Sequence, residues 1–242
     1  MRTMSDVCCV FVSGAIYRLP VILCCRGNRQ IAFYVKKSGQ DEKNVPREEK
    51  QMNAEEVVEK LKTDERNRSY TERGVMPVFQ AGPGAKVLII GQAPGKKVEE
   101  SGIPFNDKSG EKLIRWMGID RETFYSEKIA IVPMDFYYPG KGKTGDLPPR
   151  KFIAREYHPQ ILRMMPDIRL TILIGRYSMD DYLKGKMKKN LTETVAAYRE
   201  YLPEYFPIVH PSPLNFRWEA KNPWFEEQVV PVLQKTVQDI LA

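Results

Sequence analysis

The fold is decided by residues 86–95, which read KVLIIGQAPG. The run from Val87 to Ile90 is apolar, rich in branched side chains and closed by Gly91, as is typical of a strand buried on both faces of a parallel sheet. Similar runs are KIAIV at 128–132, LTILIG at 170–175 and the shorter YFPIV at 205–209. In the last run, Pro207 indicates an edge position or a strand start, because proline cannot donate to a central ladder.

Helical patterns alternate with these strands. They cover residues 109–117, 152–165, 178–183, 194–201 and 224–241, and the last predicts a buried stripe of Val229, Val230, Leu233, Val237 and Ile240. This alternation predicts an α/β fold, a three-layer α/β/α sandwich around a central, mainly parallel four-stranded sheet. Ligands of such sheets bind at the carboxyl ends of the strands.

Composition and charge limit the class of protein. The chain has 242 residues, of which 42% are hydrophobic, enough to fill a core and to exclude a wholly disordered, collagenous or coiled-coil chain. Lys and Arg number 38 against 31 Asp and Glu, a balance that favours a polyanionic partner. Residues 1–51 hold nine basic and five acidic side chains and residues 52–242 hold 29 and 26, so the globular part is only mildly basic.

The first 51 residues are predicted to be an N-terminal extension and linker, separate from a functional domain over residues 52–242. Arg18 and Pro20 interrupt the apolar stretch 7–25, so we expect no membrane span. The stretch shows no short apolar core followed by a small-residue cleavage site, so we expect no signal peptide either. Residues 36–51 are polar and charged, as in a linker. Asn53 then predicts a capped helix start. We expect the functional protein to begin near Met52, which leaves open whether residues 1–51 belong to it.

The four cysteines form two adjacent pairs, Cys8 with Cys9 and Cys24 with Cys25. Adjacent side chains rarely converge on one ion, so no metal site and no cofactor are predicted. Cysteine usage and charge together fit a reducing cytoplasm. We expect the protein to be a monomer.

Two strand-end loops carry the candidate chemistry. The first runs from Gly91 through SGIPFND at 101–107 to Gly110, and its glycines let the main chain approach a ligand with free amide groups. The second reads HPSPLN at 210–215, where two prolines hold a histidine and a serine in one frame. Both loops lie at the same end of a parallel sheet, so they can share a site.

The combination resembles the uracil-DNA glycosylase superfamily. GQAPG, Glu99, SGIPF and Gly110 look like the first motif of its iron–sulfur, or family-four, branch, and HPSPLN looks like the second motif. The resemblance implies an enzyme of base-excision repair that hydrolyses the N-glycosidic bond of uracil or a related damaged base. Its partner is then DNA, single-stranded or a duplex with a flipped base.

The resemblance also implies catalytic roles. His210 donates a hydrogen bond to a carbonyl oxygen of the leaving base. Ala93 stands where family-one enzymes carry the Asp that positions the attacking water, as is normal for family four. Glu99 matches the acidic residue of the family-four motif, and Glu100 and Asp107 are less supported alternatives.

Binding roles follow from the same motifs. Main-chain groups of Gly91, Gln92 and Ala93 in the first loop flank the base. The ring of Phe105 stacks on the base, and the side-chain amide of Asn106 is available to read it. In the second loop the hydroxyl of Ser212 binds a DNA phosphate, and the side chain of Leu214 fills the place that the flipped base leaves in the stack. Arg217 contacts the DNA backbone.

The chain departs from the family at two points. Relatives read uracil with an Asn at the end of the second strand, where this chain has AIVPM at 130–134; Asn106 or Asn215 are the candidate substitutes. No cysteine follows residue 25, so an iron–sulfur cluster is not expected.

These departures keep two alternatives open. The first is a non-catalytic nucleic-acid-binding module of the same fold, which a pocket filled by Met134 or Tyr137 would favour. The second, a nucleotide hydrolase, is weaker because the glycine-rich loop lacks P-loop spacing. The stretch FYYPGKGKTGDLPPR at 136–150 has a composition suited to DNA contact at the end of the second strand.

Overall fold

The computed structural model describes residues 53–143 and 145–242. The predicted extension and linker over 1–51, with its four cysteines, lies outside this part of the chain and stays a prediction. No helix among the described residues is long and apolar enough to cross a membrane.

The core is a four-stranded parallel sheet, as predicted. Its strands are β1 (Val87–Ile90), β2 (Ile129–Ile131), β5 (Leu170–Ile174) and β6 (Tyr205–Ile208), in the order β2-β1-β5-β6. All their residues are buried except Tyr205, which is half-buried, so the apolar runs do cover both faces. Pro207 lies in β6 at the edge of the sheet, where one side of the strand has no partner that needs an N–H group.

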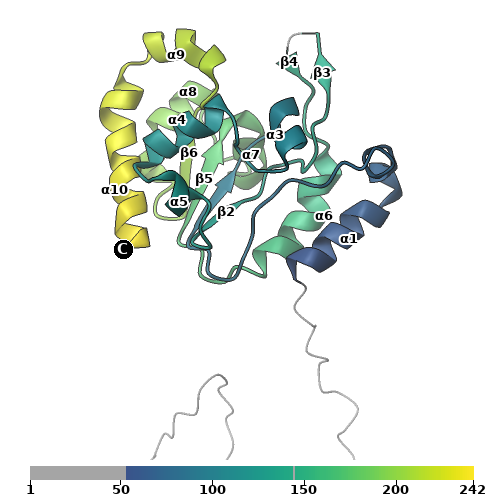
Figure 1. Ribbon diagram of the computed structural model, residues 1–242. Coiled ribbons are helices and arrows are strands. Elements are labelled where there is room, and N and C mark those ends of the chain that lie inside the picture. The colour runs from purple at the N-terminus through teal and green to yellow at the C-terminus, as the bar shows by residue number, and fades with distance from the viewer. Residues whose placement is uncertain (1–52, 144) are drawn as a thin grey trace, which may run out of the picture. The chain divides into compact units, whose positions relative to one another are not determined.

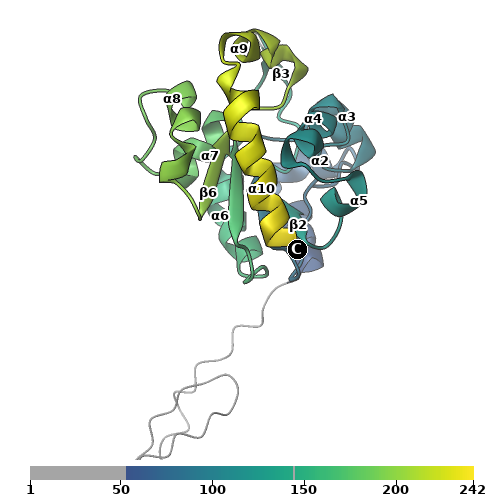
Figure 2. The same cartoon turned by 90° about the vertical axis from the view of Figure 1, so that its left-hand side faces the viewer.

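Helices cover both faces of this sheet, so the predicted three-layer sandwich is confirmed. Figure 1 shows α10 on one side of the strands and α1 and α6 on the other, and Figure 2 shows α10 lying across the sheet. The helices are α1 (Ala54–Thr63), α2 (Arg68–Thr71), α3 (Lys96–Ser101), α4 (Lys108–Met117), α5 (Arg121–Phe124), α6 (Lys151–Leu162), α7 (Gly175–Tyr182), α8 (Leu191–Ala196), α9 (Phe216–Lys221) and α10 (Val230–Leu241).

The helix boundaries follow local chemistry. Asn53 caps α1 with a capping box, since its side chain accepts from the N–H of Glu56 at 2.8 Å and the Glu56 carboxylate accepts from the N–H of Asn53 at 3.2 Å. Helix α7 starts directly after β5 because Gly175 adopts a φ of +78°, which lets the chain turn at once.

Two helix predictions need correction. The predicted helix 224–241 begins with a π turn over Phe225–Val229 before α10, and its last buried residue is Leu241, not Ile240. Leu241 continues the buried stripe because it lies four residues after Val237, whereas Ile240 is only half-buried. The predicted helix 194–201 is α8 followed by a 3-10 turn over Tyr198–Glu200.

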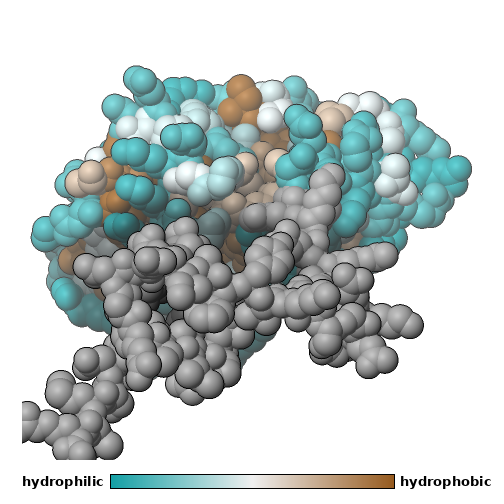
Figure 3. Space-filling view, turned by 90° about the horizontal axis from the view of Figure 1, so that it is seen from below, coloured by the Kyte–Doolittle hydropathy of each residue, from teal (hydrophilic) through white to brown (hydrophobic). Residues whose placement is uncertain are grey.

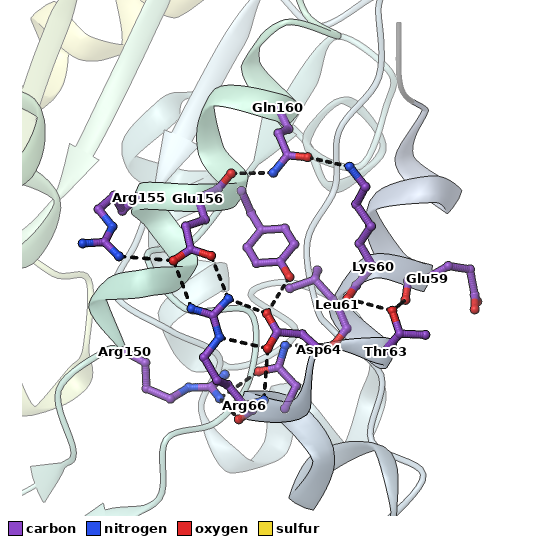
Figure 4. A network of polar contacts seen from close by, with 12 residues as sticks. Glu59, Lys60, Leu61, Thr63, Asp64, Arg66, Arg150, Arg155, Glu156 and Gln160 are labelled. Carbon is purple, nitrogen blue, oxygen red and sulfur yellow. Dashed lines mark hydrogen bonds and ion pairs between the residues drawn. The ribbon is translucent and has the colours of Figure 1, made fainter. Parts of the chain in front are cut away.

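Polar contacts join α1 and the turn after it to α6 (Figure 4). Arg66 lies between two carboxylates, at 2.6 Å from Asp64 and 2.7 Å from Glu156, and Tyr157 donates to Asp64 at 2.9 Å. The hydrogen bonds from Arg66 hold the pKa of Asp64 well below its usual range. Lys60 of α1 also donates to Gln160 of α6 at 3.1 Å. The N-terminal helix is thereby tied to the body.

The segment after β2 is closed at its base by a buried ion pair. Asp135 is fully buried and accepts from Arg150 Nε at 2.7 Å and from a second guanidinium nitrogen at 2.8 Å. Between these two residues the chain makes the short hairpin of β3 (Lys141–Gly142) and β4 (Gly145–Asp146). The basic, aromatic stretch predicted as a loop is therefore a hairpin with a clamped base.

The elements around the carboxyl ends of the strands, α3, α4, α9 and the hairpin, gather at the top of Figure 1. The face seen from below in Figure 3 is a mosaic of hydrophilic and hydrophobic residues where the described part is in view.

Candidate active site

A cavity of about 380 Å³ opens among the carboxyl ends of the strands. Its walls come from both predicted loops, from the end of β2 and from the hairpin, and include Gly91, Phe105, Pro133, Asp146 and His210. The two strand-end loops therefore share one cavity, at the edge of the sheet where ligands of parallel sheets bind.

Phe105 is held at the cavity by two glycines. A Cβ on Gly91 would lie 3.3 Å from the end of the Phe105 ring, and a Cβ on Gly110 would lie 1.7 Å from the Phe105 carbonyl oxygen. Phe105 itself adopts a φ of +53°, a left-handed conformation that costs free energy for a residue with a side chain. Because both glycines permit close contact, the first turn of α4 and the end of β1 fix this ring in the wall.

The hydrogen bonds of His210 select its tautomer. The main-chain N–H of Ser212 donates to Nδ1 of His210 at 3.1 Å, so Nδ1 is the acceptor nitrogen and Nε2 carries the proton. No described residue accepts from Nε2. Burial lowers the pKa of His210 below its usual value, against the opposing effect of the carboxylates of Asp107 and Asp146. At neutral pH the ring is a neutral donor in the cavity wall.

The main chain after β1 offers further donors. Gln92 and Ala93 line the cavity, and no described residue accepts a hydrogen bond from their main-chain N–H groups. The main chain at Gly91 and Gln92 is fixed by two hydrogen bonds. The Gly91 carbonyl accepts from the N–H of Met134 at 2.9 Å, and the Gln92 carbonyl accepts from the N–H of Asp135 at 3.1 Å. The free amides are therefore preorganised for a carbonyl oxygen or an anion.

The wall at the end of β2 is apolar. It consists of Ile131 and Pro133, and the Pro133 carbonyl bonds His158 Nε2 at 2.9 Å. Met134 and Tyr137 are buried in the core and neither belongs to the wall, so neither fills the cavity. The feature that would have favoured a binding module is not found in the part of the chain that the structure describes.

The second loop projects an apolar tip beside the cavity. Ser212 lines the cavity and its hydroxyl accepts from the N–H of Leu214 at 3.2 Å, which fixes a 3-10 turn over Pro213–Asn215. Leu214 is 84% exposed and Phe216 is 59% exposed. Arg217 is exposed and stands over the Phe216 ring at 5.6 Å. The second loop and the start of the helix after it thus expose two large apolar side chains and a cation.

This tip is anchored by contacts behind it. Trp218 donates to Thr192 at 2.9 Å, and Lys112 of α4 forms a half-buried ion pair with Glu219 of α9. The loop therefore presents Leu214 from a supported base.

Comparison with known families agrees with this geometry. The family model of the Uracil DNA glycosylase superfamily matches residues 79–234, which include all the walls of the cavity except Val78. The chain belongs to this superfamily. A solution NMR structure from Methanosarcina acetivorans, of a protein provisionally named a uracil DNA glycosylase, is similar at 16% identity and a TM-score of 0.39, covering 66% of this chain and 98% of that one.

Two residues that the superfamily resemblance assigned to the site do not line the cavity. Glu99 lies on α3, and its carboxylate accepts from the N–H of Tyr138 at 3.1 Å. Asn106 accepts from Arg121 at 2.8 Å through its amide oxygen. Asn215, the other candidate for reading the base, donates to the carbonyl of His210 at 2.7 Å and is also outside the walls.

The cavity also contains residues that the superfamily motifs did not reveal. Val78 reaches it from a segment bridged to β2, Val98 from α3, and Asp146 from β4. A single valine before the first strand gives no pattern, and α3 lies in a stretch that its Gly and Pro content predicted as loop. Of these three residues, Asp146 alone had a signal, since its stretch was singled out for its basic and aromatic composition; Pro139 of the same stretch also lines the cavity.

Proposed function

We propose that this protein is a DNA glycosylase that hydrolyses the N-glycosidic bond of uracil or a related damaged base in base-excision repair. The observation that carries the proposal is the neutral His210, held as an Nε2–H donor in the same cavity as the Phe105 ring and the free amides of Gln92 and Ala93. Superfamily membership supports the same class of reaction.

The chemistry assigns a role to each wall. A flipped base stacks on Phe105 and directs a carbonyl oxygen toward Nε2–H of His210 and the two amides. When the C1′–N bond breaks, the base leaves as an anion, and fixed donors stabilise that charge as it develops. A neutral histidine suits this task because its proton stays on Nε2 while it donates.

DNA contact falls to the second loop and its surroundings. Leu214 occupies the place of the flipped base in the stack, and the Ser212 hydroxyl and the Arg217 guanidinium bind backbone phosphates. All these residues, with the cavity walls, belong to one chain, so a monomer holds the complete site.

This site selects its base differently from relatives that recognise uracil through paired hydrogen bonds to an Asn side chain. The superfamily resemblance places that Asn at the end of the second strand, and here the cavity residues of that segment are Ile131 and Pro133, so the base edge meets an apolar wall. A site without that amide rejects cytosine less strongly by hydrogen bonding and accommodates a wider set of deaminated bases. Uracil, hypoxanthine and xanthine are therefore the substrates to compare.

The test uses the full-length chain and labelled oligonucleotides with one uracil, hypoxanthine or xanthine, in single-stranded and mismatched duplex form. We expect alkali-labile abasic sites at one or more of these bases. His210→Ala should slow their formation about 100-fold or more, with salt-sensitive DNA binding retained. Lys235→Ala, on the exposed face of α10, is the control and should match the wild type. Binding without abasic sites at any base would instead identify a non-catalytic module.

A further inference from the structure

The proposed reaction needs a group that places the attacking water, and the motif residues do not supply it. Ala93 has no polar side chain, and Glu99 is outside the cavity with its carboxylate bonded to the N–H of Tyr138. Hydrolysis at an anomeric carbon otherwise uses a carboxylate near the sugar, which accepts the water's proton and stabilises the positive charge on the ring.

Among the residues that the structure describes, two carboxylates line the cavity, those of Asp107 and Asp146. Asp146 is exposed on a two-residue strand of the hairpin and accepts from the Tyr138 hydroxyl at 3.1 Å. Asp107 is half-buried at the start of α4, and its Oδ1 accepts from the N–H groups of Ser109 at 2.9 Å and Gly110 at 3.0 Å. Only Asp107 is fixed by two main-chain donors, as a preorganised catalytic group should be.

The carboxylate of Asp107 is also fixed relative to the ring that stacks on the base. The N–H of Asp107 donates to the Phe105 carbonyl at 2.8 Å, and Gly110 packs on the same carbonyl oxygen. Oδ1 is occupied by the helix, and no described residue donates to Oδ2. One oxygen of a rigid carboxylate therefore remains for a ligand in the cavity that also holds His210.

We infer that Asp107 is the catalytic base of the reaction, binding the attacking water through Oδ2. This inference rests on the proposed glycosylase function. The C1′–N bond breaks and its electron pair leaves with the base, which is hydrogen bonded to His210. The water oxygen forms the new bond to C1′ and its proton passes to Asp107 and then to solvent. The base anion takes a proton from solvent, so one water is consumed and an abasic sugar and a free base are released.

Two substitutions at this position separate catalysis from folding. Asn and Ser both cap helices well, so Asp107→Asn and Asp107→Ser keep an acceptor for the N–H groups of Ser109 and Gly110 but remove the base. In single-turnover excision by the full-length chain, both should be slowed about 100-fold or more. Their thermal unfolding and their affinity for an oligonucleotide with an abasic-site analogue should equal those of the wild type.

Asp120→Asn is the matched control. Asp120 caps α5 through the N–H of Thr123 at 2.7 Å and lies outside the cavity, so this variant should excise at the wild-type rate. An active wild type with active Asp107 variants overturns the inference alone, and a selective loss in Glu99→Gln or Asp146→Asn moves the role to that residue. A wild type that excises none of the bases overturns both the proposed function and this inference.

Discussion

At the scale of single residues, Gly110 shows how contacts outweigh helix propensity. Glycine inside a helix costs roughly 1 kcal/mol relative to alanine, so propensity alone predicts that Gly110→Ala stabilises α4. The structure predicts the reverse, since the new methyl group would lie 1.7 Å from the Phe105 carbonyl oxygen. We expect urea unfolding to show a loss of about 1–3 kcal/mol, the usual cost of forcing atoms into a packed site.

Gly82→Ala is the control for this substitution, because no atom lies within 4 Å of a Cβ built on Gly82. Its free energy of unfolding should stay within about 0.5 kcal/mol of the wild type. If Gly110→Ala is as stable as the wild type, the close contact of Gly110 with the Phe105 carbonyl oxygen does not hold Phe105 in place.

The sequence motifs predicted the position of some single site residues and not of others. Gly91, Phe105 and His210 lie in the cavity, because strand ends and Pro-bounded loops constrain where such residues can be. Glu99 does not, because α3 turns it toward Tyr138 while Val98 reaches the cavity. Asn106 is held by Arg121, fifteen residues away, and no local pattern reports such a partner.

At the scale of elements, the ion pair between Asp135 and Arg150 sets the base of the hairpin. Asp135→Asn removes a charge that is fully buried beside the guanidinium, and breaking such a pair costs about 3–5 kcal/mol. We expect a loss of this size in urea unfolding. The control, Asp239→Asn, breaks the exposed pair with Lys235 and should cost under about 1 kcal/mol. Equal small effects in both would mean that the hairpin base needs no ion pair.

Sequence patterns predicted the strands of the main sheet and the long helices but not the two short strands of the hairpin. Buried runs such as 87–90 and 170–174 are visible because burial on both faces requires apolar residues throughout. The hairpin strands are two residues long and exposed or half-exposed, so they carry no period to detect. They are held by the clamp between Asp135 and Arg150, which is a tertiary contact.

At the scale of the whole molecule, His158 connects three parts of the fold. Its Nδ1 lies 2.6 Å from the Tyr182 hydroxyl of α7, its Nε2 lies 2.9 Å from the Pro133 carbonyl after β2, and it stands on α6. Burial lowers its pKa to about 4, while the bond to Pro133 acts in the opposite direction. The end of β2, one wall of the cavity, therefore depends on a histidine that stays neutral.

This pKa predicts how stability depends on pH. Below about pH 6.5 the unfolded chain binds a proton on His158 that the folded protein does not bind until about pH 4, so stability is full above pH 6.5 and falls as the pH drops toward 4. We expect the free energy of unfolding to drop by about 2 kcal/mol from this residue between pH 7.5 and pH 5.

The chain has two histidines, and burial shifts the pKa of His210 in the same direction. Urea unfolding at both pH values should therefore show a smaller pH-dependent loss in His158→Gln and in His210→Gln than in the wild type. A His158→Gln variant with the full wild-type loss would show that His158 is protonated in the folded protein at pH 5, and that its bond to Pro133 does not require the neutral ring.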